Sequence, residues 1–143
     1  MTRTTDDIRV GDLMTVDPVV IESDALATDA ERLLKTHHVS GLPVIEGGVT
    51  VGVISRTDLM VARSSGLISG NWQRMRVRHL MSVPAITVHA GTSPSRAAEL
   101  MVTRHIHRVV VVDDEDAPIG VLSALDLLRL LPGAERWLQP SDC

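Results

Sequence analysis

The stretch Gly120-Val-Leu-Ser-Ala-Leu-Asp126 predicts a buried strand that ends at Ser123 and leads directly into a helix. A serine hydroxyl at a helix start can contact a phosphate that lies among free backbone N–H groups. An aspartate in the first turn is suitably placed for the two hydroxyls of a ribose. The spacing therefore indicates a candidate ligand site. Both residue types are also favoured at helix starts as simple caps, and this alternative stays open.

The same pattern occurs earlier in the chain, as Gly52-Val-Ile-Ser-Arg-Thr-Asp58. The surrounding segments also match, because Val10-Gly-Asp-Leu-Met14 aligns with Val77-Arg-His-Leu-Met81 at an offset of 67 residues. A turn that is one residue longer in the second copy raises the offset to 68 at the Ser-x-x-Asp motif. A nearly constant offset along the chain predicts two repeats of one folding unit.

Each repeat is expected to fold as strand, helix, strand, strand, helix, which makes the protein α/β. Ser23 or Asp24 is a candidate cap for the first helix, and Thr92 or Ser93 for the corresponding helix of the second repeat. So small a unit buries little surface by itself, so the two repeats are predicted to pack through their sheets. The expected boundaries are 8–63 for repeat 1, 64–76 for a linker, 77–131 for repeat 2 and 132–143 for a tail.

Composition excludes several classes of function. A net charge of −4 and only two aromatic residues, Trp72 and Trp137, argue against nucleic-acid binding. No apolar run approaches the roughly 20 residues of a membrane span, and the single cysteine, Cys143, fits a reducing, cytoplasmic location. The six histidines have no cysteine or carboxylate partner at ligand spacing, so no metal site is expected.

Three sequence motifs occur in the same order in both halves of the chain. They are Leu-Met followed by Thr or Ser, a central strand, which in the first half contains Leu42-Pro43-Val44, and Ser-x-x-Asp. Together they resemble a tandem pair of cystathionine-β-synthase (CBS) domains, the Bateman module, over most of the chain. The resemblance implies a stand-alone CBS-pair protein with two pseudo-symmetric β-α-β-β-α repeats and two clefts between them. Such pairs commonly form homodimers. Their usual ligands are AMP, ADP or ATP, and sometimes S-adenosylmethionine or NAD, with no further cofactor.

The resemblance assigns roles to residues in both clefts. In the first, Ser123 would contact phosphate and Asp126 the ribose. The family's arrangement adds adenine contacts from Thr15, Val16, Pro18, Val39 and Ser40, and phosphate contacts from His107 and Arg108. The second cleft would contain Ser55, Thr57 and Asp58. Its lining would come from Val83, Ala85 and Ile106. Ser40-Gly41 matches His107-Arg108 without their charge, so the second cleft is expected to hold adenosine, another less charged ligand, or nothing.

The sequence therefore predicts a regulatory module that binds an adenosine-type nucleotide and performs no catalysis. No phosphate-binding loop, dinucleotide fingerprint or nucleophile elbow is present. A ligand would act by favouring one conformation over another. The main alternative is a docking module with empty clefts that binds a copy of itself or an unknown partner protein through its helix faces. A third alternative is an enzyme acting on adenosine nucleotides.

Overall fold

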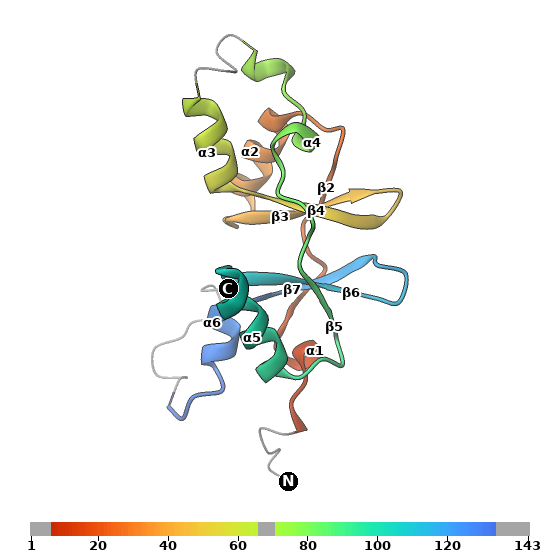
Figure 1. Cartoon of the computed structure of the whole chain (residues 1–143), viewed down its shortest axis with the longest axis vertical. Coiled ribbons are helices and arrows are strands. Elements are labelled where there is room, and N and C mark those ends of the chain that lie inside the picture. Colours follow the sequence, from red (N-terminus) through yellow and green to blue (C-terminus); the bar gives the residue numbers. More distant parts are fainter. Residues whose placement is uncertain (1–6, 66–70, 134–143) are drawn as a thin grey trace. The chain divides into compact units, whose positions relative to one another are not determined.

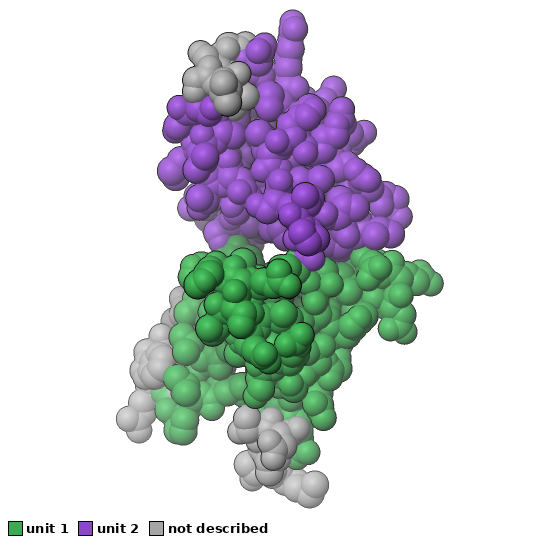
Figure 2. Space-filling model, in the orientation of Figure 1, with its two compact units in different colours: residues 1–17, 86–143 green, residues 18–85 purple. Residues whose placement is uncertain are grey.

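The computed structural model describes residues 7–65 and 71–133, which form two compact units (Figure 2). The first-repeat unit consists of residues 18–85, and the second-repeat unit consists of residues 86–133 together with 7–17. Both contain a sheet and helices, which confirms the α/β class. Part of the expected linker and most of the expected tail, including Trp137 and Cys143, lie outside the described residues.

The first-repeat unit is built on a three-stranded sheet in the order β2-β3-β4. Strand β2 runs parallel to β3, and β3 and β4 form an antiparallel hairpin in which Gly41 pairs with Ser55 (Figure 1). The apolar faces of the helices cover one side of this sheet. The elements are β2 (Ile21–Glu22), α2 (Ala27–Thr36), β3 (Gly41–Glu46), β4 (Val49–Ser55), α3 (Arg56–Ser64), the 3-10 helix η3 (Trp72–Arg74) and α4 (Val77–Leu80).

The second-repeat unit is built on a four-stranded sheet in the order β1-β7-β6-β5. Strand β5 runs parallel to β6, and β7 pairs antiparallel with both β6 and β1. The elements are α1 (Val10–Leu13), β1 (Thr15–Val16), β5 (Thr87–His89), α5 (Pro94–Arg104), β6 (Arg108–Val112), β7 (Pro118–Ser123) and α6 (Ala124–Leu128).

The two units exchange the short segments with which the repeats begin, which we call leader segments (residues 10–16 and 77–82). The first leader belongs to repeat 1 in sequence, yet its strand β1 pairs with β7 of repeat 2, with Thr15 opposite Val121. The second leader belongs to repeat 2, yet Ser82 pairs with Val53 of repeat 1 through backbone hydrogen bonds of 2.8 and 3.1 Å. Each Ser-x-x-Asp motif therefore lies in the same unit as the leader segment of the other repeat.

The glycine of each motif makes room for the leader segment. A Cβ atom on Gly120 would lie 2.5 Å from the sulfur of Met14 and 3.0 Å from the carbonyl oxygen of Thr15. A Cβ atom on Gly52 would lie 2.8 Å from the carbonyl oxygen of Ser82. Separations below 3.0 Å are essentially forbidden, so a side chain at either position would push the leader away. This packing explains why glycine precedes the apolar pair in both copies of the motif.

Each unit has its own apolar core, and Val10 and Val77 anchor the leader segments in them. Val10 donates to the carbonyl of Thr92, and Val77 donates to that of Ala25, at 2.9 and 2.8 Å. The first-repeat core contains Ile21, Ala27, Ala30, Leu34, Leu42, Val44, Ile54, Leu59 and Val77. The second-repeat core contains Val10, Val88, Ala97, Met101, Val109, Val111 and Leu122.

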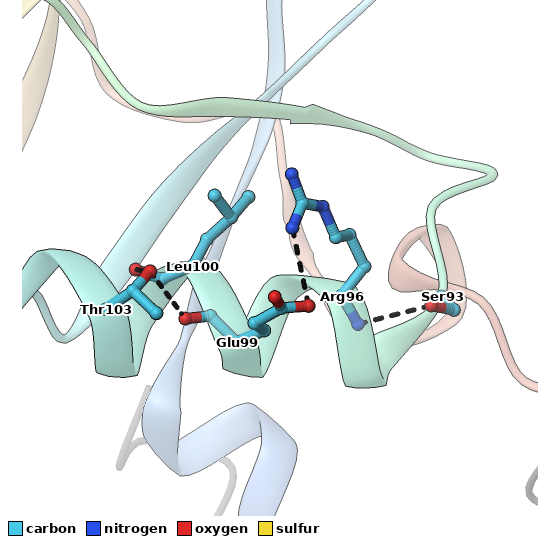
Figure 3. A network of polar contacts seen from close by, with 5 residues as sticks. All are labelled: Ser93, Arg96, Glu99, Leu100 and Thr103. Atoms are coloured by element: carbon cyan, nitrogen blue, oxygen red, sulfur yellow. Dashed lines mark hydrogen bonds and ion pairs between the residues drawn. The ribbon is translucent and has the colours of Figure 1, made fainter.

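Helix α5 begins as its sequence predicts. The hydroxyl of Ser93 accepts from the amide of Arg96 at 3.2 Å, and Pro94 takes the first helical position (Figure 3). Along the helix, Arg96 pairs with Glu99 at 3.3 Å, and the hydroxyl of Thr103 donates to the Glu99 carbonyl at 2.9 Å.

The predicted cap of α2 is wrong. The N-cap is Leu26, whose amide donates to the carboxylate of Asp29 at 3.3 Å. Ser23 is buried and donates instead to Glu46 at 2.7 Å, while its carbonyl accepts from the amide of Arg78. These tertiary contacts hold Ser23 away from the helix start.

Candidate functional site

Both Ser-x-x-Asp motifs form complete capping boxes. The hydroxyl of Ser123 accepts from the amide of Asp126 at 3.2 Å, and Oδ2 of Asp126 accepts from the amide of Ser123 at 2.8 Å. Ser55 and Asp58 make the same pair of bonds at 3.0 and 2.9 Å. The capping function is therefore present in both repeats. It uses Oδ2 of each aspartate and leaves Oδ1 for other contacts.

The capping boxes reduce the number of backbone amides that a phosphate could bind. The amide of Ala124 donates to the carbonyl of His107 at 2.8 Å, and that of Asp126 is used by the cap. In α3 the amide of Arg56 donates in the same way to the carbonyl of Ser40 at 2.9 Å. A phosphate at either helix start would therefore depend mainly on side chains, in contrast to the expectation of several free amides.

Asp126 lies in a buried, polar environment. Its side chain is 1% exposed, and Oδ1 has no hydrogen-bond partner among the described residues. The guanidinium of Arg129 lies 3.5 Å from this oxygen. A buried carboxylate oxygen without a hydrogen bond is costly, because water no longer solvates it. The position of Oδ1 is therefore suited to a donor supplied by a ligand.

Four other candidate residues lie in the same unit as Asp126. Thr15 and Val16 pair with Val121 and Gly120 of β7, the strand that ends at Ser123, and Val16 is 58% exposed. Arg108 lies directly opposite Ser123 across the β6–β7 ladder, and His107 precedes it. The structure thus brings together Thr15, Val16, His107, Arg108, Ser123 and Asp126 in the second-repeat unit.

The charge of Arg108 is only partly solvated. Desolvation by burial lowers the pKa of its guanidinium from the ordinary arginine value. Arginine remains protonated in proteins at neutral pH, so a positive charge is held beside Ser123 with part of its water removed. An anionic group would restore favourable electrostatics there, which makes this position suitable for a phosphate.

Asp58 has a different and more open environment. The hydroxyl of Ser82 donates to its Oδ1 at 3.3 Å and lies 3.5 Å from Oδ2. Ser82 is exposed and was missed by the sequence interpretation, although it aligns with Thr15 at the repeat offset of 67. The predicted residues Ser55, Thr57, Val83 and Ala85 lie in the same unit as Asp58.

The remaining predicted residues belong to the other unit in each case. Pro18, Val39 and Ser40 are part of the first-repeat unit, whereas Asp126 is in the second. Ile106 is part of the second-repeat unit, whereas Asp58 is in the first. Their participation in the two clefts stays a prediction. The guanidinium of Arg56 is directed to the carbonyl of Val39 at 3.5 Å.

Among the described residues, no three histidine, cysteine, aspartate or glutamate side chains are grouped closely enough to hold a metal ion. In residues 7–65 and 71–133, no helix has the length and apolar character needed to cross a membrane.

Comparison with known proteins gives consistent matches. The profile of the CBS domain matches twice, at residues 10–65 and 77–133. An inosine-5′-monophosphate dehydrogenase of Korarchaeum cryptofilum is 30% identical over 111 residues, which are 78% of this chain and 22% of that enzyme. The chain spans between 22% and 40% of the length of three curated relatives that it matches.

Solved structures match over most of their own length. CBSX2 of Arabidopsis thaliana, solved in complex with AMP, is 32% identical with a TM-score of 0.74, and the match covers 85% of this chain and 94% of that one. A CBS domain pair in complex with 5′-methylthioadenosine and S-adenosyl-L-methionine is 26% identical, with the same TM-score and the same coverage.

Proposed function

The chain belongs to the CBS-domain family as a tandem pair of repeats, and on that premise we propose that it is a regulatory module that binds an adenosine-type nucleotide beside Asp126. Relatives of this fold have been solved with AMP, and with 5′-methylthioadenosine and S-adenosyl-L-methionine. All of these compounds carry a ribose attached to adenine. The proposal extends this shared ligand class to the present chain.

The observation that carries the proposal is the buried Oδ1 of Asp126, which accepts no hydrogen bond from the described residues and has the guanidinium of Arg129 3.5 Å away. It lies in the same unit as Thr15 and Arg108. A ribose hydroxyl would supply the missing donor as a charge-assisted hydrogen bond. Arg108, His107 and the hydroxyl of Ser123 would then contact a phosphate, which favours AMP, ADP or ATP over a neutral nucleoside.

The cleft of Asp58 is proposed to be a weaker and less selective site. Asp58 already accepts from Ser82, so a ribose would have to compete with an existing donor. The position that matches His107-Arg108 is Ser40-Gly41, which carries no charge. Adenosine is therefore the favoured ligand for this cleft.

The mechanism is linkage without chemistry on the ligand. A ligand changes the conformation or partner surface of the module only as far as it binds one state better than another. We propose repeats at 8–63 and 77–131, joined by a linker at 64–76 and followed by a tail at 132–143. A homodimer, a partner protein and a cytoplasmic location are parts of the same proposal.

A thermal-shift titration of the full chain tests the function. The compounds are AMP, ADP, ATP, S-adenosylmethionine and NAD, with GTP as the control. A ligand that binds only the folded state stabilises it by about 2.7 kcal/mol at a concentration of 100 Kd. We expect a shift with an adenosine compound that Asp126→Ala abolishes. Asp29→Ala, which removes a carboxylate cap from α2, is the matched control and should keep the shift.

The docking alternative is supported by a groove between α2 and α3. It has a volume of about 610 Å³, and Met60 on its wall is 62% exposed. Its lining combines apolar and charged or polar side chains: Leu34, Leu59, Met60, Glu31, Lys35, His38, Arg56 and Arg63. If no adenosine compound shifts the unfolding temperature at millimolar concentration, the nucleotide proposal is wrong and this groove becomes the first surface to test for a protein partner.

A further inference from the structure

Arg129 follows Asp126 by one helical turn and occupies the carboxylate oxygen that the capping box does not use. We propose that Arg129 is a gate, which closes the ribose position of Asp126 in the ligand-free protein and must be displaced when a ligand binds. The inference rests on the proposed function and adds to it the residue that sets affinity at this cleft.

The geometry places the guanidinium where the ribose would bind. Nη1 of Arg129 lies 3.5 Å from Oδ1 of Asp126, while Oδ2 is held at 2.8 Å by the amide of Ser123. The carboxylate is 1% exposed, whereas the side chain of Arg129 is 35% exposed. The aspartate is therefore inaccessible in this state, whereas the arginine side chain is partly exposed to solvent.

The first repeat shows the same site without a gate. At the offset of 68, Asp126 corresponds to Asp58 and Arg129 corresponds to Val61. Val61 is 65% exposed and has no charge with which to pair. Asp58 instead accepts a hydrogen bond from Ser82, which is a neutral donor. The two sites therefore share the capping box and differ in the cation at the third position after the aspartate.

The exchange of arginine for ribose has a predictable electrostatic cost. A carboxylate in a buried site is stabilised by a neighbouring guanidinium, and two neutral hydroxyls replace only part of that stabilisation. The cost is largest for a neutral ligand such as adenosine. A nucleotide also carries a phosphate, and the displaced guanidinium can interact with this anion. The electrostatic cost of binding is therefore smaller for AMP than for adenosine.

The direct test is isothermal titration of the full chain with adenosine and with AMP. Arg129→Val gives the Asp126 site the residue that the Asp58 site has at the matching position, Val61. We expect this variant to bind adenosine about tenfold more tightly, with a smaller gain for AMP. Arg96→Val, which removes an arginine from an exposed ion pair in the same unit, is the matched control and should leave both affinities unchanged. Unchanged or weaker adenosine binding by Arg129→Val overturns the gate.

A second measurement needs no ligand. The unfolding temperatures of Arg129→Val, Asp126→Asn and the double variant form a thermodynamic cycle. We expect Arg129→Val to lower the temperature less when Asp126 is already neutral, because the buried charge that it leaves unpaired is gone. If the changes in unfolding temperature are additive, the two side chains do not interact. That result would overturn the inference regardless of the ligand-binding results.

The outcomes separate this inference from the proposed function. If the wild type binds an adenosine compound and Arg129→Val binds it no better, the function stands and the gate is wrong. If only Arg129→Val binds, both are supported. If neither protein binds any of the compounds, the proposed function fails at this cleft and the gate is rejected with it.

Discussion

Met14 lies against Gly120, so close that a methyl group on the glycine would come within 2.5 Å of the methionine sulfur. The two residues belong to different repeats in sequence and to one unit in the structure. This contact brings the leader segment of repeat 1 beside the Ser-x-x-Asp motif of repeat 2.

Gly120→Ala should destabilise the protein by about 1–3 kcal/mol, because the added methyl group forces Met14 and the backbone of Thr15 outward. Urea unfolding monitored by circular dichroism measures the effect. Gly91→Ala is the control, since a Cβ atom there meets nothing within 4 Å. If both variants have the wild-type midpoint, the close packing of the leader segment is wrong.

Ser123→Ala and Ser55→Ala should each cost about 1 kcal/mol of stability, because each removes the side-chain acceptor of a capping box. Chemical denaturation of the two variants tests this expectation. Replacement by glycine serves as a second comparison, since glycine is tolerated at N-caps and should cost only a few tenths of a kcal/mol. Equal losses for alanine and glycine would contradict the capping explanation.

Arg108→Gln should weaken AMP binding more than adenosine binding. Burial lowers the pKa of Arg108 because the protein replaces part of its water, and a phosphate would compensate for that loss. The glutamine keeps a polar group without the charge. Calorimetric affinities for both ligands give the comparison. Equal loss for AMP and adenosine would mean that Arg108 does not contact the phosphate.

Trp72→Phe should destabilise the first-repeat unit by about 1 kcal/mol. The indole Nε1 donates to Glu31 of α2 at 2.9 Å, and the guanidinium of Arg63 of α3 lies 5.3 Å from the ring centre while pairing with the same glutamate. These contacts attach η3 to two helices. Arg32→Ala, which removes only an exposed ion pair with Asp29, should have little effect in the same unfolding assay.

Local features of the fold were predictable from short sequence windows. Ser93 followed by Pro94 correctly indicated the start of α5, and the Ser-x-x-Asp spacing correctly indicated the starts of α3 and α6. These features depend on residues within one helical turn. Ser23 failed as a cap because Glu46 and Arg78, both distant in sequence, compete for its hydroxyl and its backbone.

The candidate site was predictable only in part. Asp126 and Asp58 stood out through their repetition, and the family resemblance added Thr15, His107 and Arg108. Ser82 and Arg129 were missed. Ser82 contacts Asp58 only because the second leader segment pairs with β4. Arg129 lies on the sequence-predicted helix, but its pairing with Asp126 matters because the carboxylate is buried, and burial depends on the whole unit.

The sequence by itself determined that the chain has two α/β repeats, where helices α3, α5 and α6 begin, and which two aspartates carry the candidate sites. All of these follow from periodicity, spacing and internal repetition. Only the tertiary structure decided the register in which each leader segment pairs with the strand of its motif, and the burial of Asp126. Strand β1 is two residues long and has no strong pattern of its own, so its place beside β7 depends on packing between Met14 and Gly120. The same packing brings Thr15 next to the strand that ends at Ser123.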